Sequence, residues 1–111
     1  MAKLYRGHVI EVIAPAGPGK FKPRPVIVLQ NVGKNSDMVT VYCTSQNNGD
    51  DNNNIFVAAN SKEGTEMGLA KDTYIRPNKI LNLSIKSFSR ILGKCPLMAE
   101  ITKIIDDNLA K

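Results

Sequence analysis

The chain has 111 residues, enough for one domain, and 42% of them are hydrophobic, which excludes a disordered polypeptide. It carries 15 lysines and arginines against 10 aspartates and glutamates, and this net charge of +5 weakly favours an anionic partner. Two cysteines and one histidine exclude a structural zinc site in one chain and an acid–base ribonuclease built on two histidines. Two cysteines are also too few for a disulfide framework, so we expect a cytoplasmic protein. No apolar run approaches the length needed to span a membrane, so we expect no membrane segment.

The N-terminal part predicts two strands joined by a loop. Residues 8–13 alternate between apolar and polar side chains, which is typical of a strand. Glycines and prolines predict a loop over residues 14–23, which carries Lys20 and Lys22. Residues 25–29 form a continuous apolar run, so we expect a strand that is buried on both faces and opens at its proline.

The middle of the chain predicts two further strands separated by polar loops. Residues 38–44 alternate, which places Thr44 on the face opposite the apolar side chains, where its hydroxyl reaches solvent. Residues 46–54 are polar and turn-forming, and they predict an exposed loop. Residues 55–58 predict a short strand. The Gly-containing stretch 60–68 predicts another loop.

The C-terminal part ends in a helix. Residues 69–75, 80–83 and 90–94 are strand-like, and residues 84–89 predict one helical turn. Residues 96–109 have apolar side chains at helical spacing. The side chains expected in the core are Leu97, Met98, Ile101, Ile104, Ile105 and Leu109.

Five to seven short strands followed by one helix predict a mainly β fold with a C-terminal helix. Such a sheet has to bend strongly or close into a barrel to cover its apolar face. The chain shows no repeat and no linker, so we expect a single domain over residues 1–111.

Six segments, in this order and spacing, resemble the PemK/MazF toxins. The segments are Arg6–Ile10, Arg24–Gln30, Cys43–Gln46, Gly68–Arg76, Lys79–Leu83 and Arg90–Lys94. The resemblance extends over residues 5–109. It implies a small SH3-like barrel, a homodimer, and an mRNA interferase of a type II toxin–antitoxin system that cleaves single-stranded RNA without a metal or cofactor. It also implies a small acidic antitoxin that blocks the RNA groove.

The resemblance carries a catalytic pair onto Arg24 and Thr44. Cleavage by attack of the RNA 2′-hydroxyl needs positive charge at the phosphoryl oxygens, and the planar fork of an arginine supplies it. Because a proline follows Arg24, that residue is expected to be extended. Without the resemblance, the alternatives are a solvated loop arginine and a threonine that caps a strand end.

The remaining site predictions are less direct. His8 stands where the family usually has an acid, and it is a candidate general base or a structural histidine. Ser45 and Asp72 are candidate catalytic or supporting residues. The alternative for Asp72 is an ordinary turn residue without a role in catalysis. The predicted RNA-binding residues are Lys20, Lys22, Gln46, Lys71, Arg76 and Lys79.

Positive charge is concentrated in two segments of the chain. Residues 1–40 hold six lysines and arginines against two acids, and residues 71–95 hold six against one. If the fold joins these segments, they form a track for phosphates.

The alternative function is a non-catalytic barrel that binds nucleic acid or a protein partner.

Two other groups of residues are not expected to carry chemistry. Asp50 and Asp51 are neighbours in a polar loop and rarely converge on a metal ion. Cys43 is predicted to lie in the core, whereas Cys95 is predicted to be an ordinary surface thiol.

Overall fold

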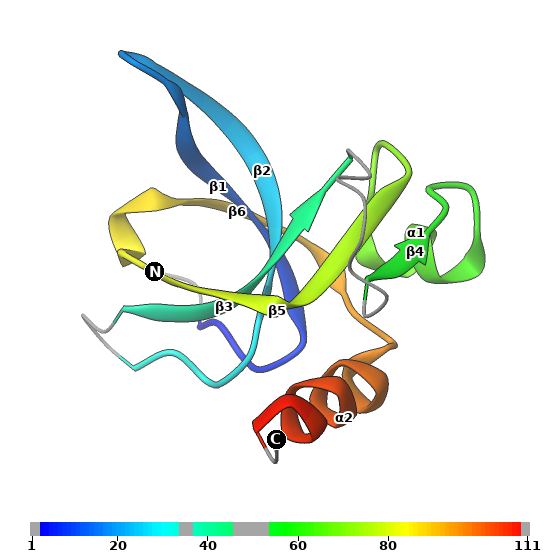
Figure 1. Ribbon diagram of the computed structural model, residues 1–111. Coiled ribbons are helices and arrows are strands. Elements are labelled where there is room, and N and C mark those ends of the chain that lie inside the picture. Colours follow the sequence, from blue (N-terminus) through cyan, green and yellow to red (C-terminus); the bar gives the residue numbers. More distant parts are fainter. Residues whose placement is uncertain (1–2, 34–36, 46–53, 110–111) are drawn as a thin grey trace.

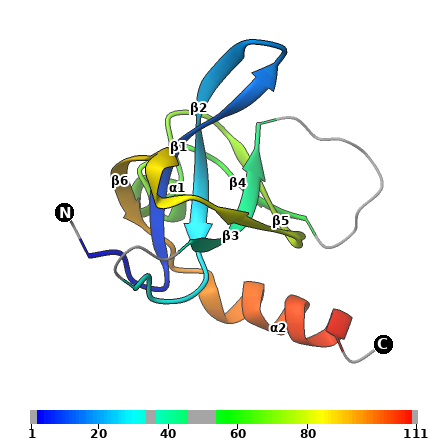
Figure 2. The same cartoon turned by 90° about the vertical axis from the view of Figure 1, so that its left-hand side faces the viewer.

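Six antiparallel strands form one strongly curved sheet in the order β4-β5-β3-β2-β1-β6 (Figures 1 and 2). The computed structural model describes residues 3–33, 37–45 and 54–109. The elements are β1 (His8–Gly17), β2 (Lys20–Val28), β3 (Met38–Thr44), β4 (Ile55–Val57), α1 (Lys62–Met67), β5 (Thr73–Leu83), η1 (Ile85–Ser87), β6 (Phe88–Lys94) and α2 (Met98–Leu109). The mainly β prediction is confirmed, with the sheet bent into a half-barrel.

β1 and β2 form a long hairpin that projects from the rest of the sheet (Figure 1). The predicted loop over residues 14–23 is therefore wrong. Ala14 pairs with Lys22 and Gly17 with Lys20, so only a tight turn separates the strands. Gly17 and Gly19 both have positive φ, and they make this turn possible. The lysines expected on a loop thus lie on a strand.

β2 contains Pro23 and Pro25 in its interior, whereas Pro25 was expected to open the strand. Both pair with β1, but β3 pairs with β2 only at Val26–Val28. At the two prolines, one side of β2 has no partner strand among the described residues, so the missing N–H groups cost no ladder hydrogen bond there. The apolar run that follows is buried, as predicted.

β5 joins two segments that the sequence presents as separate strands. The register passes from the pair Val41–Ile80 directly to the pair Tyr42–Arg76, which leaves three residues of β5 as a bulge that includes Pro77. The bulge accommodates the proline and bends the strand. Residues 69–72 lie before β5 and are not part of any strand, contrary to the prediction.

α1 replaces the loop expected over residues 60–68. Ser61 caps the helix, since its Oγ accepts a hydrogen bond from the N–H of Gly64 at 3.0 Å. Gly68 ends the helix in the left-handed conformation. Both capping residues could be seen in the sequence. The helix was still not predicted, because a six-residue helix with one buried apolar side chain shows no helical pattern of apolar residues.

The predicted helical turn, the last strand and the C-terminal helix are confirmed as η1, β6 and α2. α2 lies against one side of the sheet (Figure 2), where Ile101 is fully buried in a cluster with Ile27 and Val41. A second cluster, which includes Ile10 and Met38, fills the other side of the sheet. None of the helices in the described ranges is long and apolar enough to cross a membrane.

Candidate active site

A pocket of about 620 Å³ lies between β1, β2, β3, β6 and the segment from Gly68 to Thr73. Within the described part of the chain, four cations and one acid line it: Lys22, Arg24, Lys71, Arg90 and Glu11. Lys22 and Arg24 are near neighbours on β2, but the other charged residues of the pocket come from distant parts of the chain. This concentration of charge arises because the curved sheet brings strands from both ends of the chain to one hollow.

Arg24 and Thr44, the predicted catalytic pair, both line this pocket. Arg24 is half-buried on β2, where it pairs with Val12 of β1. Thr44 ends β3 and is only 5% exposed, so the prediction that its side chain reaches solvent is wrong. β3 is an interior strand of a curved sheet, and both of its faces are covered. Ser45, also predicted, lies next to Thr44 in the same pocket and is exposed.

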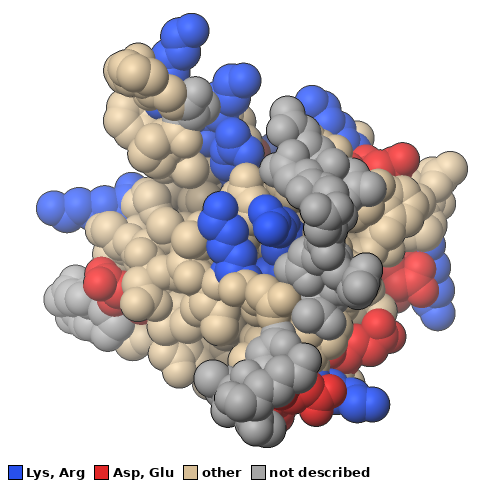
Figure 3. Space-filling model, viewed as in Figure 1, with Lys and Arg blue, Asp and Glu red and all other residues tan. Residues whose placement is uncertain are grey.

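The predicted RNA-binding lysines divide into two groups. Lys22 and Lys71 line the pocket, whereas Lys20 lies on the exposed end of the hairpin outside it. Figure 3 shows lysine and arginine side chains on this hairpin and again at the middle of the same face. Gln46 lies outside the described residues.

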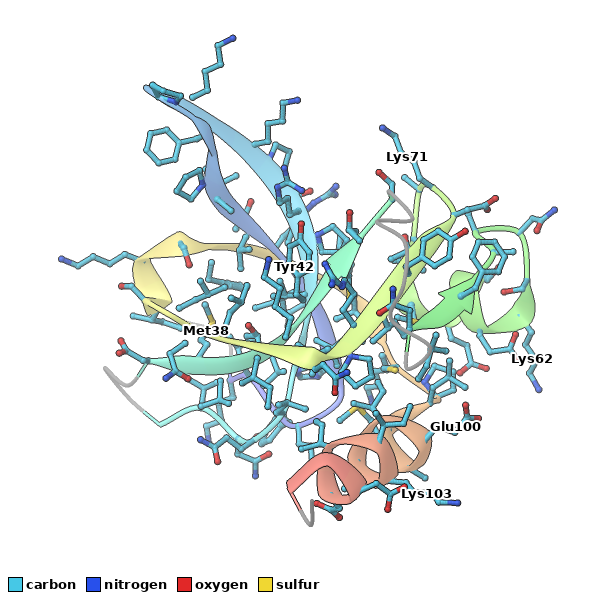
Figure 4. The ribbon with its side chains drawn as sticks, viewed as in Figure 1. Met38, Tyr42, Lys62, Lys71, Glu100 and Lys103 are labelled. Carbon is cyan, nitrogen blue, oxygen red and sulfur yellow. The ribbon has the colours of Figure 1, made fainter. Side chains whose placement is uncertain are left out.

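Tyr42 connects the pocket to the other two predicted cations. It lines the pocket, and the Nζ of Lys79 lies 4.3 Å from the centre of its ring, as expected for a cation–π contact. Arg76 pairs with Tyr42 across β5 and β3, and its buried Nε has no hydrogen-bond partner among the described residues. In Figure 4, Tyr42 lies at the middle of the face. The fold therefore brings the two basic segments together.

His8 and Asp72 do not line the pocket. The Nδ1 of His8 accepts a hydrogen bond from the backbone N–H of Tyr5 at 3.0 Å, which fixes the turn before β1. Asp72 accepts one from the backbone N–H of Ala59 at 2.9 Å, which ties the segment before β5 to the one after β4. In this structure, both side chains support local backbone rather than the pocket.

Among the described residues, four polar side chains of the pocket were not predicted from the sequence: Glu11, Tyr42, Thr73 and Arg90. Glu11 is the most informative of them. Its Oε1 accepts a hydrogen bond from the Oγ of Ser89 at 3.1 Å, and its Oε2 lies 3.4 Å from an Nη of Arg90. Thr73 lines the pocket as well. One signal was available: Glu11 is the only acid in the strand-like stretch 8–13, and a half-buried acid usually needs a partner.

Cys43 is buried in the core as predicted, but the prediction that Cys95 is a surface thiol is wrong. Cys95 is 8% exposed, because the chain turns inward between β6 and α2. Burial raises the pKa of both thiols above the ordinary value of 9.0. No group of three or more potential metal ligands occurs in the described ranges, and Asp50 and Asp51 lie outside them.

The buried thiols predict a loss of stability at alkaline pH. Above pH 9 the Cys43 thiol ionises in the unfolded chain, whereas its raised pKa keeps it protonated in the folded protein. The unfolded state therefore binds fewer protons, and the free energy of unfolding should fall by about 1.4 kcal/mol between pH 8 and pH 10. Urea unfolding at several pH values measures this fall. In Cys43→Ala the fall should become smaller; an unchanged pH dependence would contradict the assignment.

Comparisons with known proteins agree with this fold. A family model described as PemK-like, MazF-like toxin of type II toxin–antitoxin system matches residues 5–111. The crystal structure of MazF (Form-I) from Deinococcus radiodurans superimposes with a TM-score of 0.72 at 18% identity, and the match covers 100% of both chains. An endoribonuclease from a mycobacterial species, solved in complex with its cognate antitoxin, gives 0.65 at 21% identity over 96% of this chain and 95% of that one. No curated protein sequence matches the chain.

Proposed function

Because the chain belongs to the PemK-like, MazF-like toxin family of type II toxin–antitoxin systems, a family of endoribonucleases, we propose that its pocket cleaves single-stranded RNA. The observation that carries the proposal is the meeting of Arg24 and Thr44 in one pocket with Lys22 and Lys71. These four residues come from three separate parts of the chain, and together they present hydrogen-bond donors and positive charge to one hollow.

In the proposed reaction, the RNA 2′-hydroxyl attacks the adjacent phosphate. Negative charge grows on the phosphoryl oxygens, and the guanidinium of Arg24 binds it with two parallel hydrogen bonds. The hydroxyl of Thr44 donates a further hydrogen bond to the phosphate. Lys22 and Lys71 hold the neighbouring phosphates by charge. The arginine supplies the positive charge that the step requires, so the proposed chemistry needs no metal.

The cations around Tyr42 extend the proposed RNA path beyond the pocket. Lys79 lies over the Tyr42 ring, and Arg76 is the cross-strand partner of Tyr42. An aromatic ring between cations suits single-stranded nucleic acid, because a base stacks on the ring while the cations hold the backbone. We therefore propose that the single-stranded RNA runs from Arg24 toward β5.

Two partners and a location belong to the same proposal. A solved relative was crystallised with its cognate antitoxin. For this chain we propose a small acidic antitoxin, whose carboxylates neutralise the cations of the pocket while it blocks RNA. The resemblance also implies a homodimer, and we propose that the toxin acts in the cytoplasm, where its RNA substrate is found.

Incubation of the purified protein with a long single-stranded RNA in EDTA tests the proposed activity. We expect fragments that end in a cyclic phosphate and begin with a 5′-hydroxyl, since the 2′-oxygen is the nucleophile. A DNA of the same sequence should remain intact because it lacks that oxygen. Tight RNA binding without any product would instead favour a non-catalytic nucleic-acid-binding barrel and contradict the proposal.

A further inference from the structure

Glu11 lies on β1, which pairs with the strand of Arg24. The cross-strand partner of Arg24 is Val12, so the side chains of Glu11 and Arg24 leave the two strands on opposite faces. Glu11 pairs with Arg90 of β6 on one side and with Pro25 of β2 on the other, and Pro25 directly follows Arg24. Glu11, Arg24 and Thr44 nevertheless line the same pocket.

Two donors from β6 orient the Glu11 carboxylate. Ser89 donates to Oε1 at 3.1 Å, and Arg90 approaches Oε2 at 3.4 Å. The side chain of Glu11 is only 20% exposed, whereas that of Arg90 is 69% exposed. Each carboxylate oxygen can accept more than one hydrogen bond, so these two contacts fix the group without using its capacity to accept a proton.

Among the described residues that line this pocket, Glu11 supplies the one carboxylate, a group that can accept a proton. The other charged groups that line the pocket are lysines and arginines, whose charged side chains are hydrogen-bond donors with no acceptor. The hydroxyls of Thr44, Ser45 and Thr73 are poor bases unless another group activates them. His8, the sequence candidate for this role, does not line the pocket.

We propose that Glu11 is the general base of the RNA cleavage reaction, an inference that rests on the proposed function. The carboxylate takes the proton of the 2′-hydroxyl as the 2′-oxygen forms its bond to phosphorus. The bond between phosphorus and the 5′-oxygen breaks, and its electron pair leaves with that oxygen, which takes a proton from water. The products are a 2′,3′-cyclic phosphate and a 5′-hydroxyl. The proton on Glu11 then returns to solvent.

The proposal is tested by single-turnover cleavage of RNA by Glu11→Gln. The glutamine has nearly the same size but cannot accept the proton, so we expect the rate to fall about 100-fold. Binding of a 2′-O-methyl RNA of the same sequence, which cannot be cleaved, should change less than threefold. Glu11→Asp should retain more activity than Glu11→Gln. Glu100→Gln, which removes an exposed carboxylate on α2, is the matched control and should cleave at the normal rate.

Chemical rescue separates a base from a group that only balances the charge of Arg90. In Glu11→Ala, added acetate or formate should restore part of the rate, since a small carboxylate fits the vacated space; Glu100→Ala should not respond. Cleavage by Glu11→Gln within threefold of the unmodified rate would overturn this inference while the proposed function stands. A loss without rescue, accompanied by an equal loss of 2′-O-methyl RNA binding, would overturn it as well. If the unmodified protein itself fails to cleave, the proposed function fails.

Discussion

Replacing Arg24 with alanine is expected to slow RNA cleavage about 10³-fold, because it removes the group proposed to bind the charge of the transition state. Loss of a single donor at such a position typically costs 10² to 10³ in rate, and an arginine provides two donors and a full charge. A loss of 10³ corresponds to about 4 kcal/mol of transition-state stabilisation. Single-turnover cleavage of a long RNA in EDTA measures it.

The position of Arg24 explains why the effect should be larger on the rate than on binding. Lys22 and Lys71 line the same pocket, so several cations remain to hold the RNA backbone. Binding of an uncleavable 2′-O-methyl RNA should therefore weaken only about tenfold, close to what one lost phosphate contact costs. Arg24 lines the pocket together with Thr44, and it is the cation that we propose meets the charge that develops during the reaction.

Two further variants control for the loss of charge. Arg24→Lys keeps the charge but loses the planar fork, so its rate should lie between those of the unmodified protein and the alanine variant. Lys103→Ala removes one positive charge from the exposed face of α2, far from the pocket lining, and should cleave normally (Figure 4). If Arg24→Ala cleaved within threefold of the unmodified rate, Arg24 would not be the group that stabilises the transition state.

Replacing Gly68 with alanine is expected to destabilise the protein by about 3 kcal/mol or more. A Cβ at this position would lie 2.1 Å from the carbonyl oxygen of Leu92 in β6, and backbone cannot move aside as a flexible side chain can. Gly68 also has a φ of 71°, which side chains other than glycine rarely adopt. Strain and collision add, so the melting temperature should fall by about 12 °C or more.

Gly19→Ala is the matched control, because Gly19 has nearly the same φ of 68° but nothing lies within 4 Å of the added Cβ. Its cost should be the backbone strain alone, about 1 kcal/mol. Thermal unfolding followed by circular dichroism compares the two variants directly. Equal losses of stability would show that backbone strain alone accounts for the cost of Gly68→Ala. The close approach of α1 to β6 would then not contribute to that cost.

The contact at Gly68 connects stability to the site. Gly68, Leu69 and Lys71 form one wall of the pocket, and Leu92 of β6 lies on another. A second glycine, Gly93, approaches α1 equally closely, since a Cβ there would lie 2.2 Å from the carbonyl oxygen of Glu66. Two glycines therefore allow α1 to pack closely against β6, and this packing places Lys71 at the pocket. The sequence alone could not show this contact.

Local pattern determined most of the fold. The alternation in β3, the apolar run ending β2, and the helical period of α2 each depend on neighbours in sequence, and each prediction was confirmed. The predicted loop over residues 14–23 failed for a physical reason. Glycines and prolines mark a chain reversal, but only pairing between strands decides how far each strand continues past it.

The sequence by itself determined the family resemblance, the mainly β architecture and the choice of Arg24 and Thr44 as the central pair. The tertiary structure decided which other residues join them. It brought Glu11, Arg90 and Lys71 into the pocket and left His8 and Asp72 outside it. The physical reason is that a side chain's face and level in a curved sheet depend on strand register and bulges, such as the one at Pro77, which are set by packing between distant segments.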